Sequence, residues 1–515
     1  MVVDHEKLYR GPIFDTSGIE RERMPGSRLV YSDLATTVFE QFRATALQAP
    51  NSEALVELGG RRLSFRQTLV EVEDVAKRLV ANGVRSGDRV GIQLPNGVDW
   101  VLAFMGTLAA GAIAVPINIR LTETEIKYIV ENAELSYTFG VDGELADADR
   151  EVVLPKVDAR DSAAIFYTSG TTGLPKGAIL SHENLTSTVE NCRRAADLPR
   201  GGFRSLISVP LFHVTGCNAQ LLPALAFGGA SVLLPKLDVG LFFDAMRDER
   251  IDLLLSVPAI YWLAMSVPEF EALDTSGVRW VLYGGAPISP DLVMRLRKAF
   301  PFSKLGNGFG MTEATALATF LPDAFATLRP ETVGLAVPVV EVDIVDPDPQ
   351  SGIGELKLRG QSVFKGYWKN DAANESSFQD GWYLTGDMAT IDRFGFVTIV
   401  DRRKDMIIRG GENVYSIEVE NAISALDGVA EVAVVGVLDP VMGEKVGAVV
   451  VPQAGNPITP ESIADQLSDS LAVFKIPEYY YISPSSLPRN PAGKVLKDRY
   501  RSGVEWTGVR HPKKS

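Results

Sequence analysis

A chain of 515 residues is too long for one compact core and predicts about three core-sized units, at roughly 150 residues each. A composition that is 46% hydrophobic and 23% charged excludes wholesale disorder. Lys and Arg number 51 against 65 Asp and Glu, so the net charge is −14. This charge disfavours general binding to nucleic acids or anionic membranes, because their phosphates would repel the chain.

The chain contains two cysteines and four histidines, and it has no HExxH pattern. These residues predict neither a disulfide framework nor a zinc site. The N-terminal stretch MVVDHEKLYRGP has no apolar segment of the kind that a secretory signal requires. We therefore expect a cytoplasmic protein, and we expect residues 1–30 to form a loose N-terminal extension.

From Leu34 onward, helical and strand-like stretches alternate in the manner of an α/β domain. The segment SFRQTLVEVEDVAKRLVANG predicts an amphipathic helix with Ser64 as its N-cap and Gly83 as its stop, and DRVGIQL predicts the strand that follows. Two uncharged runs, Trp100–Ile119 and Asn218–Pro235, approach the length of a membrane span. Glycine interrupts each run, at Gly111 in the first and at Gly228 and Gly229 in the second, so we expect a helix, a stop and a buried strand, and no transmembrane segment.

After about residue 335 the pattern changes to short strands bounded by glycine, VEVDIVD, GELKLRG and FGFVTIVD, which indicate an antiparallel, barrel-like subdomain. The stretch from residue 416 to the C-terminus predicts a separate small α+β unit. We predict an α/β protein whose large N-terminal domain, residues 31–401, has doubly wound sheets and the barrel-like subdomain. A small, mobile C-terminal domain would follow at residues 402–515.

The segment YTSGTTGLPKG, Tyr167–Gly177, carries the strongest chemical signal of the chain. Glycines allow backbone N–H groups to approach an anion, hydroxyls add donors, and Lys176 adds positive charge, so the segment predicts a triphosphate-binding loop. It is not a Walker A motif, because Lys176 follows proline and not glycine. Strand-like stretches flank it on both sides, so we expect it to join two strands. Its predicted phosphate-binding residues are Thr168, Ser169, Gly170, Thr171, Thr172, Gly173 and Lys176.

The segment resembles the phosphate loop of the adenylate-forming superfamily, which includes acyl-CoA synthetases, peptide-synthetase adenylation domains and firefly-type luciferases. Further segments agree with that family in order and spacing: YGGAPIS (283–289), GFGMTE (308–313), GWYLTGD (381–387), DRRKDMIIRGGENVYS (401–416) and PRNPAGKVLK (488–497). The resemblance implies a two-step reaction. A carboxylate attacks the α-phosphate of ATP to give an acyl-adenylate and pyrophosphate, and the thiol of CoA then displaces AMP.

The resemblance also implies a role for individual residues. Glu313 and Thr172 would hold Mg²⁺, Thr312 would donate to the α-phosphate, and Lys494 would act on the carboxylate and the phosphate during adenylation. The small domain would turn about Lys404 between the two steps. The remaining nucleotide or thiol contacts are implied at Gly285, Ala286, Pro287, Asn307, Gly308, Phe309, Gly310, Met311, Asp387, Arg402, Gly410 and Gly411.

For the acid, His213 resembles the aromatic gate between the acyl site and the thiol tunnel of the family. Apolar or small residues would line the pocket and suit a hydrophobic tail: Val214, Val257, Tyr261, Gly284, Gly308 and Met311. The stretch PLFHVTG offers no carboxylate for a buried ammonium, which argues against amino-acid activation. Leu282 occupies the position where coumarate ligases carry lysine. An aliphatic or alicyclic acid is therefore preferred over an aryl acid.

The sequence is also compatible with other functions. An acyl-AMP ligase that loads a carrier protein, an aryl-acid CoA ligase and a nucleotide-binding regulator without turnover would share much of this sequence. The expected small molecules are ATP, Mg²⁺, CoA and a carboxylic acid, with no nucleic acid. The resemblance also allows a homodimer, and a lysine acetyltransferase that would modify Lys494 and remove its charge.

Overall fold

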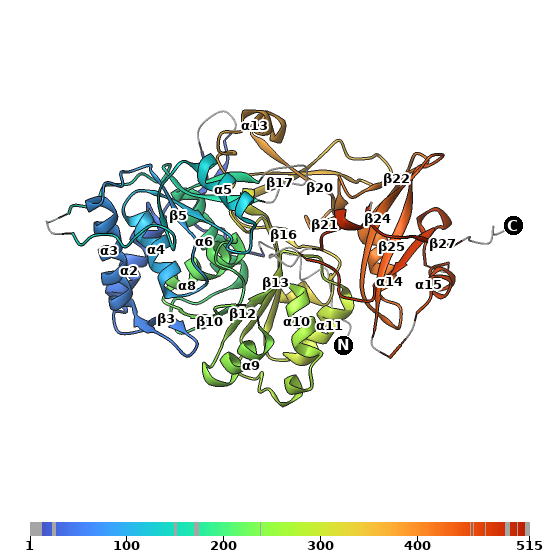
Figure 1. Cartoon of the computed structure of the whole chain (residues 1–515), viewed down its shortest axis with the longest axis horizontal. Coiled ribbons are helices and arrows are strands. Elements are labelled where there is room, and N and C mark those ends of the chain that lie inside the picture. The colour runs from blue at the N-terminus through green and yellow to red at the C-terminus, as the bar shows by residue number, and fades with distance from the viewer. Residues whose placement is uncertain are drawn as a thin grey trace.

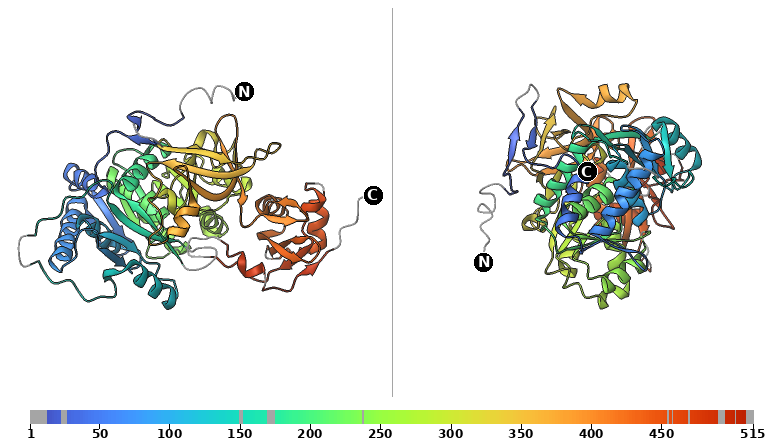
Figure 2. Two further views of the ribbon diagram at one scale, coloured as in Figure 1. Left: turned by 90° about the horizontal axis from the view of Figure 1, so that it is seen from above. Right: turned by 90° about the vertical axis from the view of Figure 1, so that its left-hand side faces the viewer.

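A computed structural model describes residues 13–22, 27–148, 152–168, 175–236, 238–453, 455–456, 458–468, 470–489, 495–501 and 503–509. Most of the chain forms a large body, drawn from blue to light orange in Figure 1, and the last elements form a smaller body at its right-hand end. Figure 2 shows the same division from above, with the C-terminal elements set apart beyond the yellow strands.

The largest sheet of the described chain has the order β16-β15-β14-β13-β12-β10-β11-β3-β4. Its central strands are parallel, and β4, β15 and β16 pair in antiparallel fashion at the edges. The bounds are β3 Glu53–Glu57, β4 Arg62–Ser64, β10 Arg204–Ile207, β11 Ala230–Leu233, β12 Leu253–Ser256, β13 Trp280–Gly284, β14 Lys304–Phe309, β15 Thr319–Leu321 and β16 Leu335–Ala336. Three helices cover one face through apolar side chains: α9 (Val239–Asp248), α10 (Pro258–Met265) and α11 (Pro290–Ala299).

The second sheet has the order β7-β5-β6-β8-β9, and only the last pair is antiparallel. Its strands are β5 Arg89–Ile92, β6 Ile113–Pro116, β7 Leu135–Phe139, β8 Ser162–Thr168 and β9 Lys176–Ser181. Apolar residues of α3 (Phe65–Ala81) and α4 (Val98–Ala109) share a core with one face, and α5 (Glu123–Ala133) packs on the other. The predicted doubly wound architecture is therefore confirmed.

The helix and strand predictions for these segments are confirmed. Ser64 caps α3 with a full capping box, and Gly83 follows the helix with φ of 93°. Gly111 (φ 70°) separates α4 from β6, and Gly228 (φ 78°) separates α8, Leu222–Phe227, from β11. Among the described residues, no helix has both the length and the apolarity that crossing a bilayer requires.

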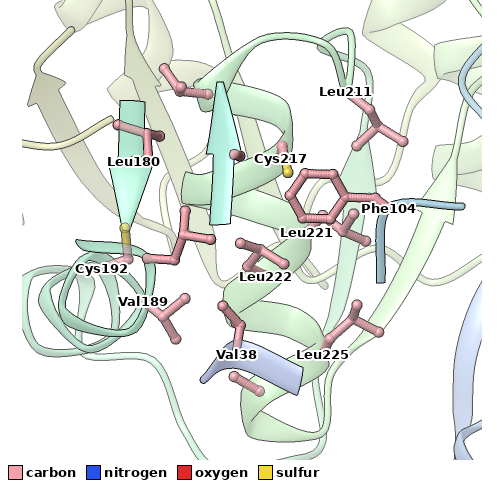
Figure 3. Packing of buried hydrophobic residues seen from close by; sticks show 14 of the residues in the cluster. Val38, Phe104, Leu180, Val189, Cys192, Leu211, Cys217, Leu221, Leu222 and Leu225 are labelled. Atoms are coloured by element: carbon pink, nitrogen blue, oxygen red, sulfur yellow. The ribbon is translucent and has the colours of Figure 1, made fainter. Parts of the chain in front are cut away.

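The helices α2 (Val38–Gln48), α4, α6 (His182–Ala196) and α8 contribute buried apolar side chains to one shared core. Figure 3 shows α8 surrounded by Val38 of α2, Phe104 of α4, and Val189 and Cys192 of α6. Both cysteines are free and buried, and burial raises the pKa of each thiol. They are packing residues in the core, which agrees with the absence of a predicted disulfide framework.

A third, antiparallel sheet follows, with the order β17-β18-β20-β19 and β21 paired with β20. Its strands are β17 Val340–Val345, β18 Gly354–Gly360, β19 Phe378–Gln379, β20 Trp382–Ile391 and β21 Val397–Arg402. It confirms the antiparallel subdomain predicted after residue 335. Shorter elements of the large body are α7 Val214–Gly216, η1 Cys217–Leu221, η2 Pro268–Ala272, η3 Thr312–Ala314, α12 Asp323–Ala326 and α13 Asp371–Ser377.

The expectation that residues 1–30 form a loose extension is wrong for the described residues 13–22 and 27–30. Strand β1 (Ile19–Arg21) pairs with β2 (Leu29–Tyr31), and Phe14 is buried. The Tyr31 hydroxyl donates to Asn191 Oδ1 in α6 (2.7 Å), and Arg21 pairs with Glu341 of β17 (2.6 Å). Burial of these aromatic side chains and their polar contacts over-rides the polar, Pro/Gly-marked composition.

The small body is an α+β unit, as predicted. Its sheet has the order β23-β22-β25-β26-β27, with β24 paired to β25. The strands are β22 Ile407–Arg409, β23 Glu412–Val414, β24 Val429–Asp439, β25 Gly443–Pro452, β26 Tyr479–Ile482 and β27 Thr507–Gly508. Its helices are α14 Ser416–Ser424, α15 Pro460–Leu467, η4 Val473–Lys475 and α16 Asp498–Arg501.

Candidate functional site

The predicted phosphate loop is the connection between β8 and β9. These strands pair in antiparallel register with Thr168 opposite Lys176, and the Thr168 hydroxyl donates to the Lys176 carbonyl oxygen (3.4 Å). The loop therefore joins two strands, as expected. The predicted residues Ser169, Gly170, Thr171, Thr172 and Gly173 lie outside the described residues.

A segment from the distant β18–α13 connection lies along β9. The Ile179 N–H donates to the Gly366 carbonyl (2.9 Å), and the Trp368 N–H donates to the Gly177 carbonyl (2.7 Å). Tyr367 stands between these bonds and forms an isolated antiparallel bridge with Ala178. This pairing places the Tyr367 ring beside the foot of the phosphate loop, 5.2 Å from Lys176 Nζ.

Glu313 lies in the one-turn helix η3, directly after Thr312. The Tyr367 hydroxyl donates to Glu313 Oε1 (2.7 Å), and the Phe364 N–H donates to the Glu313 carbonyl (2.8 Å). Burial raises the pKa of Tyr367, and the Glu313 charge raises it further, so the phenol stays a donor. The structure thus brings both Lys176 and the predicted Mg²⁺ ligand Glu313 to one aromatic side chain, Lys176 near its ring and Glu313 at its hydroxyl.

The turn that follows Glu313 is held from the core. Thr315 adopts a left-handed conformation (φ 59°), which is uncommon for a β-branched residue and needs support from its surroundings. Its hydroxyl donates to the Ser362 carbonyl (2.6 Å), and Asn218 Nδ2 donates to the Thr315 carbonyl (3.1 Å). Asn218 belongs to η1, a π-helical turn that begins four residues after His213.

The nucleotide-binding residues predicted at 285–287 and 307–311 gather where β13 and β14 end. The strands are parallel, and Gly284 is the register partner of Gly308. Ligands of open α/β sheets bind beyond the carboxyl ends of such strands. Phe309 closes β14 and is half-buried, and Gly285 begins the β13 turn with φ of 74°. Gly285, Ala286, Pro287, Asn307, Gly308, Gly310 and Met311 all lie in or next to these two strand ends.

Asp387 and Arg402 face each other across β20 and β21. They are register partners, and Arg402 Nε lies 3.0 Å from Asp387 Oδ1. The Asp387 side chain is only 3% exposed, whereas that of Arg402 is 39% exposed. The pair therefore joins a buried carboxylate to a guanidinium that solvent and ligands can reach, an arrangement suited to a diol such as ribose.

The predicted acyl residues come from separate elements of the large body. Val257 is the N-cap of α10, and its methyl carbon Cγ1 would lie 3.7 Å from a Cβ at Gly285. The buried Tyr261 hydroxyl donates to the Leu282 carbonyl (2.8 Å), so its polar atom is already satisfied and its role in a pocket is packing. The His213 ring lies against that of Phe212, with 4.9 Å between the centroids and 52° between the ring planes, and Val214 begins α7.

In the small body, the predicted hinge residue Lys404 accepts a hydrogen bond at its carbonyl from Arg501 Nη2 (3.2 Å). Gly410 and Gly411 form the turn between β22 and β23, with φ of 60° and 91°. Only residues that tolerate the left-handed region fit such a turn without strain. Lys494 lies outside the described residues.

A buried polar cluster at the junction of the two bodies was not predicted. Asp401 is 1% exposed and accepts bonds from the Ser416 N–H and from the Ser416 hydroxyl (3.0 Å). Lys497 Nζ in turn donates to Ser416 Oγ (2.8 Å) and lies 2.6 Å from Glu420 Oε1. Burial raises the pKa of Asp401 to about 6, partly opposed by the Lys497 charge.

Sequence reasoning also missed Tyr367 and Asn218. Tyr367 stands in a Gly-Tyr-Trp stretch that carries no charge, and Asn218 stands inside an apolar run. Neither residue type has a spacing that singles it out, because each acts on a residue far away in the sequence. A polar residue inside an apolar run was the one available signal for Asn218, since buried polar side chains need a partner.

Two family models match the chain. The AMP-binding enzyme model covers residues 42–368, and the AMP-binding enzyme C-terminal domain model covers residues 418–494. The chain belongs to the AMP-binding enzyme family. This membership places it in the adenylate-forming superfamily that its motifs resemble.

Two relatives that cover most of the chain carry the names of CoA ligases or synthases. A feruloyl-CoA synthase of an Amycolatopsis species is 35% identical over 88% of this chain and 96% of the relative. The long-chain-fatty-acid–CoA ligase FadD13 of Mycobacterium tuberculosis is 32% identical over 90% of this chain and 98% of the relative. Among solved structures, ATP-bound MatB from Rhodopseudomonas palustris superimposes with a TM-score of 0.82 at 30% identity, covering 90% of this chain and 98% of that one.

Proposed function

We propose that this member of the family is an ATP-dependent acid:CoA ligase of the AMP-forming type. The carboxylate oxygen of the acid attacks the α-phosphorus of ATP, and the bond to the β-phosphate oxygen breaks to release pyrophosphate. The CoA thiol then attacks the acyl carbon, loses its proton, and displaces AMP. The observation that carries the proposal is that Lys176 and Glu313 both contact Tyr367, next to the strand ends that the predicted phosphate-binding loop connects.

Glu313 fits Mg²⁺ bound to a nucleotide. The described residues contain no group of three or more His, Cys, Asp or Glu side chains that could hold a metal by themselves. Mg²⁺ commonly takes one or two protein carboxylates and completes its shell with phosphate oxygens and water. Glu313, with one oxygen oriented by Tyr367, is such a carboxylate, and Thr172 is the second proposed ligand. The ion would neutralise phosphate charge.

Lys494 is the proposed catalytic cation of the first step, and Thr312 the proposed α-phosphate donor. Lys404 is the proposed hinge between a large domain ending at residue 401 and a small domain from residue 402. Lys494→Ala is expected to lower acid-dependent pyrophosphate release by orders of magnitude, because Lys494 is the side chain proposed to act on both the carboxylate and the α-phosphate. Thioester formation from a supplied acyl-adenylate should persist. Full pyrophosphate release by this variant would exclude the assigned role.

The proposed acid has a hydrophobic tail. Val214, Val257, Tyr261, Gly284, Gly308 and Met311 supply apolar or small side chains, and His213 would gate the way to the thiol. Leu282 in place of a lysine favours an aliphatic or alicyclic acid of medium length or longer. The feruloyl-CoA synthase relative favours an aryl acid as the second candidate.

A panel of acids tests the proposed function directly. With ATP, Mg²⁺ and CoA, the enzyme should release AMP and pyrophosphate and form a thioester with at least one hydrophobic acid. Formation of ADP, or an acyl-adenylate that never reacts with CoA, would overturn it. The second result would indicate transfer to a carrier protein. Aryl acids and saturated acids of increasing length, compared at equal concentration, decide between the two substrate classes.

Further properties complete the proposal. Acetylation of Lys494 by a lysine acetyltransferase would remove the catalytic charge, so the acetylated enzyme should lose pyrophosphate release and recover it after deacetylation. We also propose a cytoplasmic protein that forms a homodimer. Fractionation of cells and the mass in solution test these two points.

A further inference from the structure

We infer that Tyr367 is a positioning residue for the metal-binding carboxylate of Glu313, and that its hydroxyl sets how tightly the enzyme binds Mg²⁺ together with ATP. This inference rests on the proposed function, because it assigns Glu313 to the metal of the nucleotide. It begins from the hydrogen bond between the Tyr367 hydroxyl and Glu313 Oε1 (2.7 Å).

The backbone around Tyr367 is held on both sides. Beyond its pairing with β9, the Tyr367 N–H donates to Asn374 Oδ1 (2.6 Å), and Asn374 Nδ2 donates back to the Tyr367 carbonyl (3.1 Å). Gly366 has φ of 131°, and a Cβ there would lie 2.9 Å from Asn374 Oδ1. These contacts hold the Tyr367 backbone in place, so the position from which its side chain extends towards Glu313 is defined.

The Tyr367 ring is packed as firmly as its backbone. It makes an edge contact with Phe364 (centroids 4.9 Å apart), and the hydroxyl lies 3.4 Å from that of Tyr383. Tyr367 is 6% exposed and Tyr383 is 5% exposed, so water cannot easily replace either phenol. A donor in such surroundings orients a carboxylate before any ligand arrives.

Orientation matters because Glu313 is a single carboxylate on a one-turn helix. Without a donor, its side chain would sample several rotamers, and binding a metal would cost that freedom. A donor to one oxygen leaves the other oxygen to bind the metal. Partners of metal-binding side chains commonly contribute about 10–100-fold to metal affinity.

The same ring touches Lys176. Because the ammonium lies 5.2 Å from the ring centroid, the aromatic face attracts the cation while the hydroxyl serves the carboxylate. Tyr367→Phe keeps the ring and its contact with Lys176 and removes only the hydroxyl. The variant therefore separates the hydrogen bond to Glu313 from the support of the phosphate loop.

The test measures binding of ATP by isothermal titration calorimetry over a range of Mg²⁺ concentrations, without acid or CoA. Tyr367→Phe should raise the Mg²⁺ concentration for half-maximal ATP binding by about tenfold or more. Saturating Mg²⁺ should restore ATP affinity, which a misfolded site would not allow. The matched control is Tyr137→Phe, whose hydroxyl donates to the Gly143 carbonyl (2.9 Å) and which should not change the Mg²⁺ dependence.

An unchanged Mg²⁺ dependence in a folded Tyr367→Phe protein would overturn the inference. So would a loss of ATP binding that no Mg²⁺ concentration restores, since that marks a purely structural role. Glu313→Gln is the second variant, which keeps the side-chain size, and it must raise the Mg²⁺ requirement as well. If it does not, the inference fails whatever Tyr367→Phe does. A wild-type enzyme that binds Mg²⁺ and ATP but activates no acid would refute the proposed function and leave this binding test standing.

Discussion

Replacing Gly284 by alanine would place a methyl group between the carboxyl ends of β13 and β14. A Cβ at this position would lie 2.2 Å from the carbonyl oxygen of Gly308, the register partner of Gly284. Ordinary van der Waals contact begins at 3.4 Å, so the two strands would have to separate by about 1 Å. The obstacle is backbone, and no flexible side chain can turn aside.

The expected cost follows from that geometry. Over-packing a well-packed region costs about 1–3 kcal/mol, and a backbone obstacle puts Gly284→Ala near the upper end, at about 3 kcal/mol. Because Gly308 and Phe309 must move with their strand, the KM for ATP should rise as well. The change thus tests both the packing of the two strand ends and the proposed nucleotide contacts there.

Two neighbouring glycines serve as controls. A Cβ at Gly285 would meet nothing closer than Val257 Cγ1 at 3.7 Å, but its φ of 74° makes alanine strained, at about 1 kcal/mol. A Cβ at Gly277 has no atom within 4 Å, so Gly277→Ala should be close to neutral. Urea unfolding of the three variants, followed by far-UV circular dichroism, gives their free energies of unfolding relative to the parent.

The order of destabilisation should be Gly284→Ala, then Gly285→Ala, then Gly277→Ala. A Gly284→Ala protein within about 0.5 kcal/mol of the Gly277→Ala protein would refute the reasoning, because surface changes alone span that range. An unaltered KM for ATP in a destabilised Gly284→Ala protein would instead separate the strand contact from nucleotide binding.

Three further predictions concern buried ionisable side chains. Burial raises the pKa of Asp401 from 3.8 to about 6, so its contribution to stability falls by at most about 3 kcal/mol as the pH rises through this window. In Asp401→Asn, the free energy of unfolding measured with urea should no longer fall for this reason between pH 4 and 6. The same pH dependence in the variant and the parent would contradict this prediction. Burial lowers the pKa of His182 from 6.5 to about 4. The neutral imidazole therefore makes its full contribution to the free energy of unfolding above pH 6.5, and that contribution is lost as the pH falls towards 4. In His182→Gln, the free energy of unfolding should fall less between pH 6.5 and 4 than in the parent protein. An equal fall in both proteins would argue against this prediction. Asp387→Asn keeps the shape of the side chain but loses the charge that pairs with Arg402. The KM for ATP should rise roughly tenfold while the melting temperature changes little. An unchanged KM would exclude Asp387 as a nucleotide contact.

Local patterns in the chain predicted much of the fold. A helix cap at Ser64 and glycine stops at Gly83, Gly111 and Gly228 act within a few residues, and the structure has each of them where it was expected. The antiparallel strands after residue 335 and the α+β unit after residue 416 are confirmed for the same reason. The N-terminal segment was not predictable in this way, because what orders it is contact with α6 and β17, far along the chain.

The candidate site divides along the same line. Motif residues such as Lys176, Glu313 and Asp387 could be chosen from the sequence, because their chemistry is carried by the residue type and its immediate neighbours. Tyr367 could not, since its hydroxyl meets a carboxylate that is 54 positions away in the sequence. Asn218 was missed for the same reason, as its partner is the Thr315 carbonyl.

By itself, the sequence determined which segments are helices, strands and turns, and which residue types gather in the motifs of an adenylate-forming enzyme. Only the tertiary structure decided which side chains hold those motifs in place. The pairing of residues 365–368 with β9 and the burial of Asp401 at the junction of the two bodies arise from contacts between distant segments. Such contacts form when apolar surface is buried and polar groups find partners in space, and neither event leaves a periodic trace along the chain.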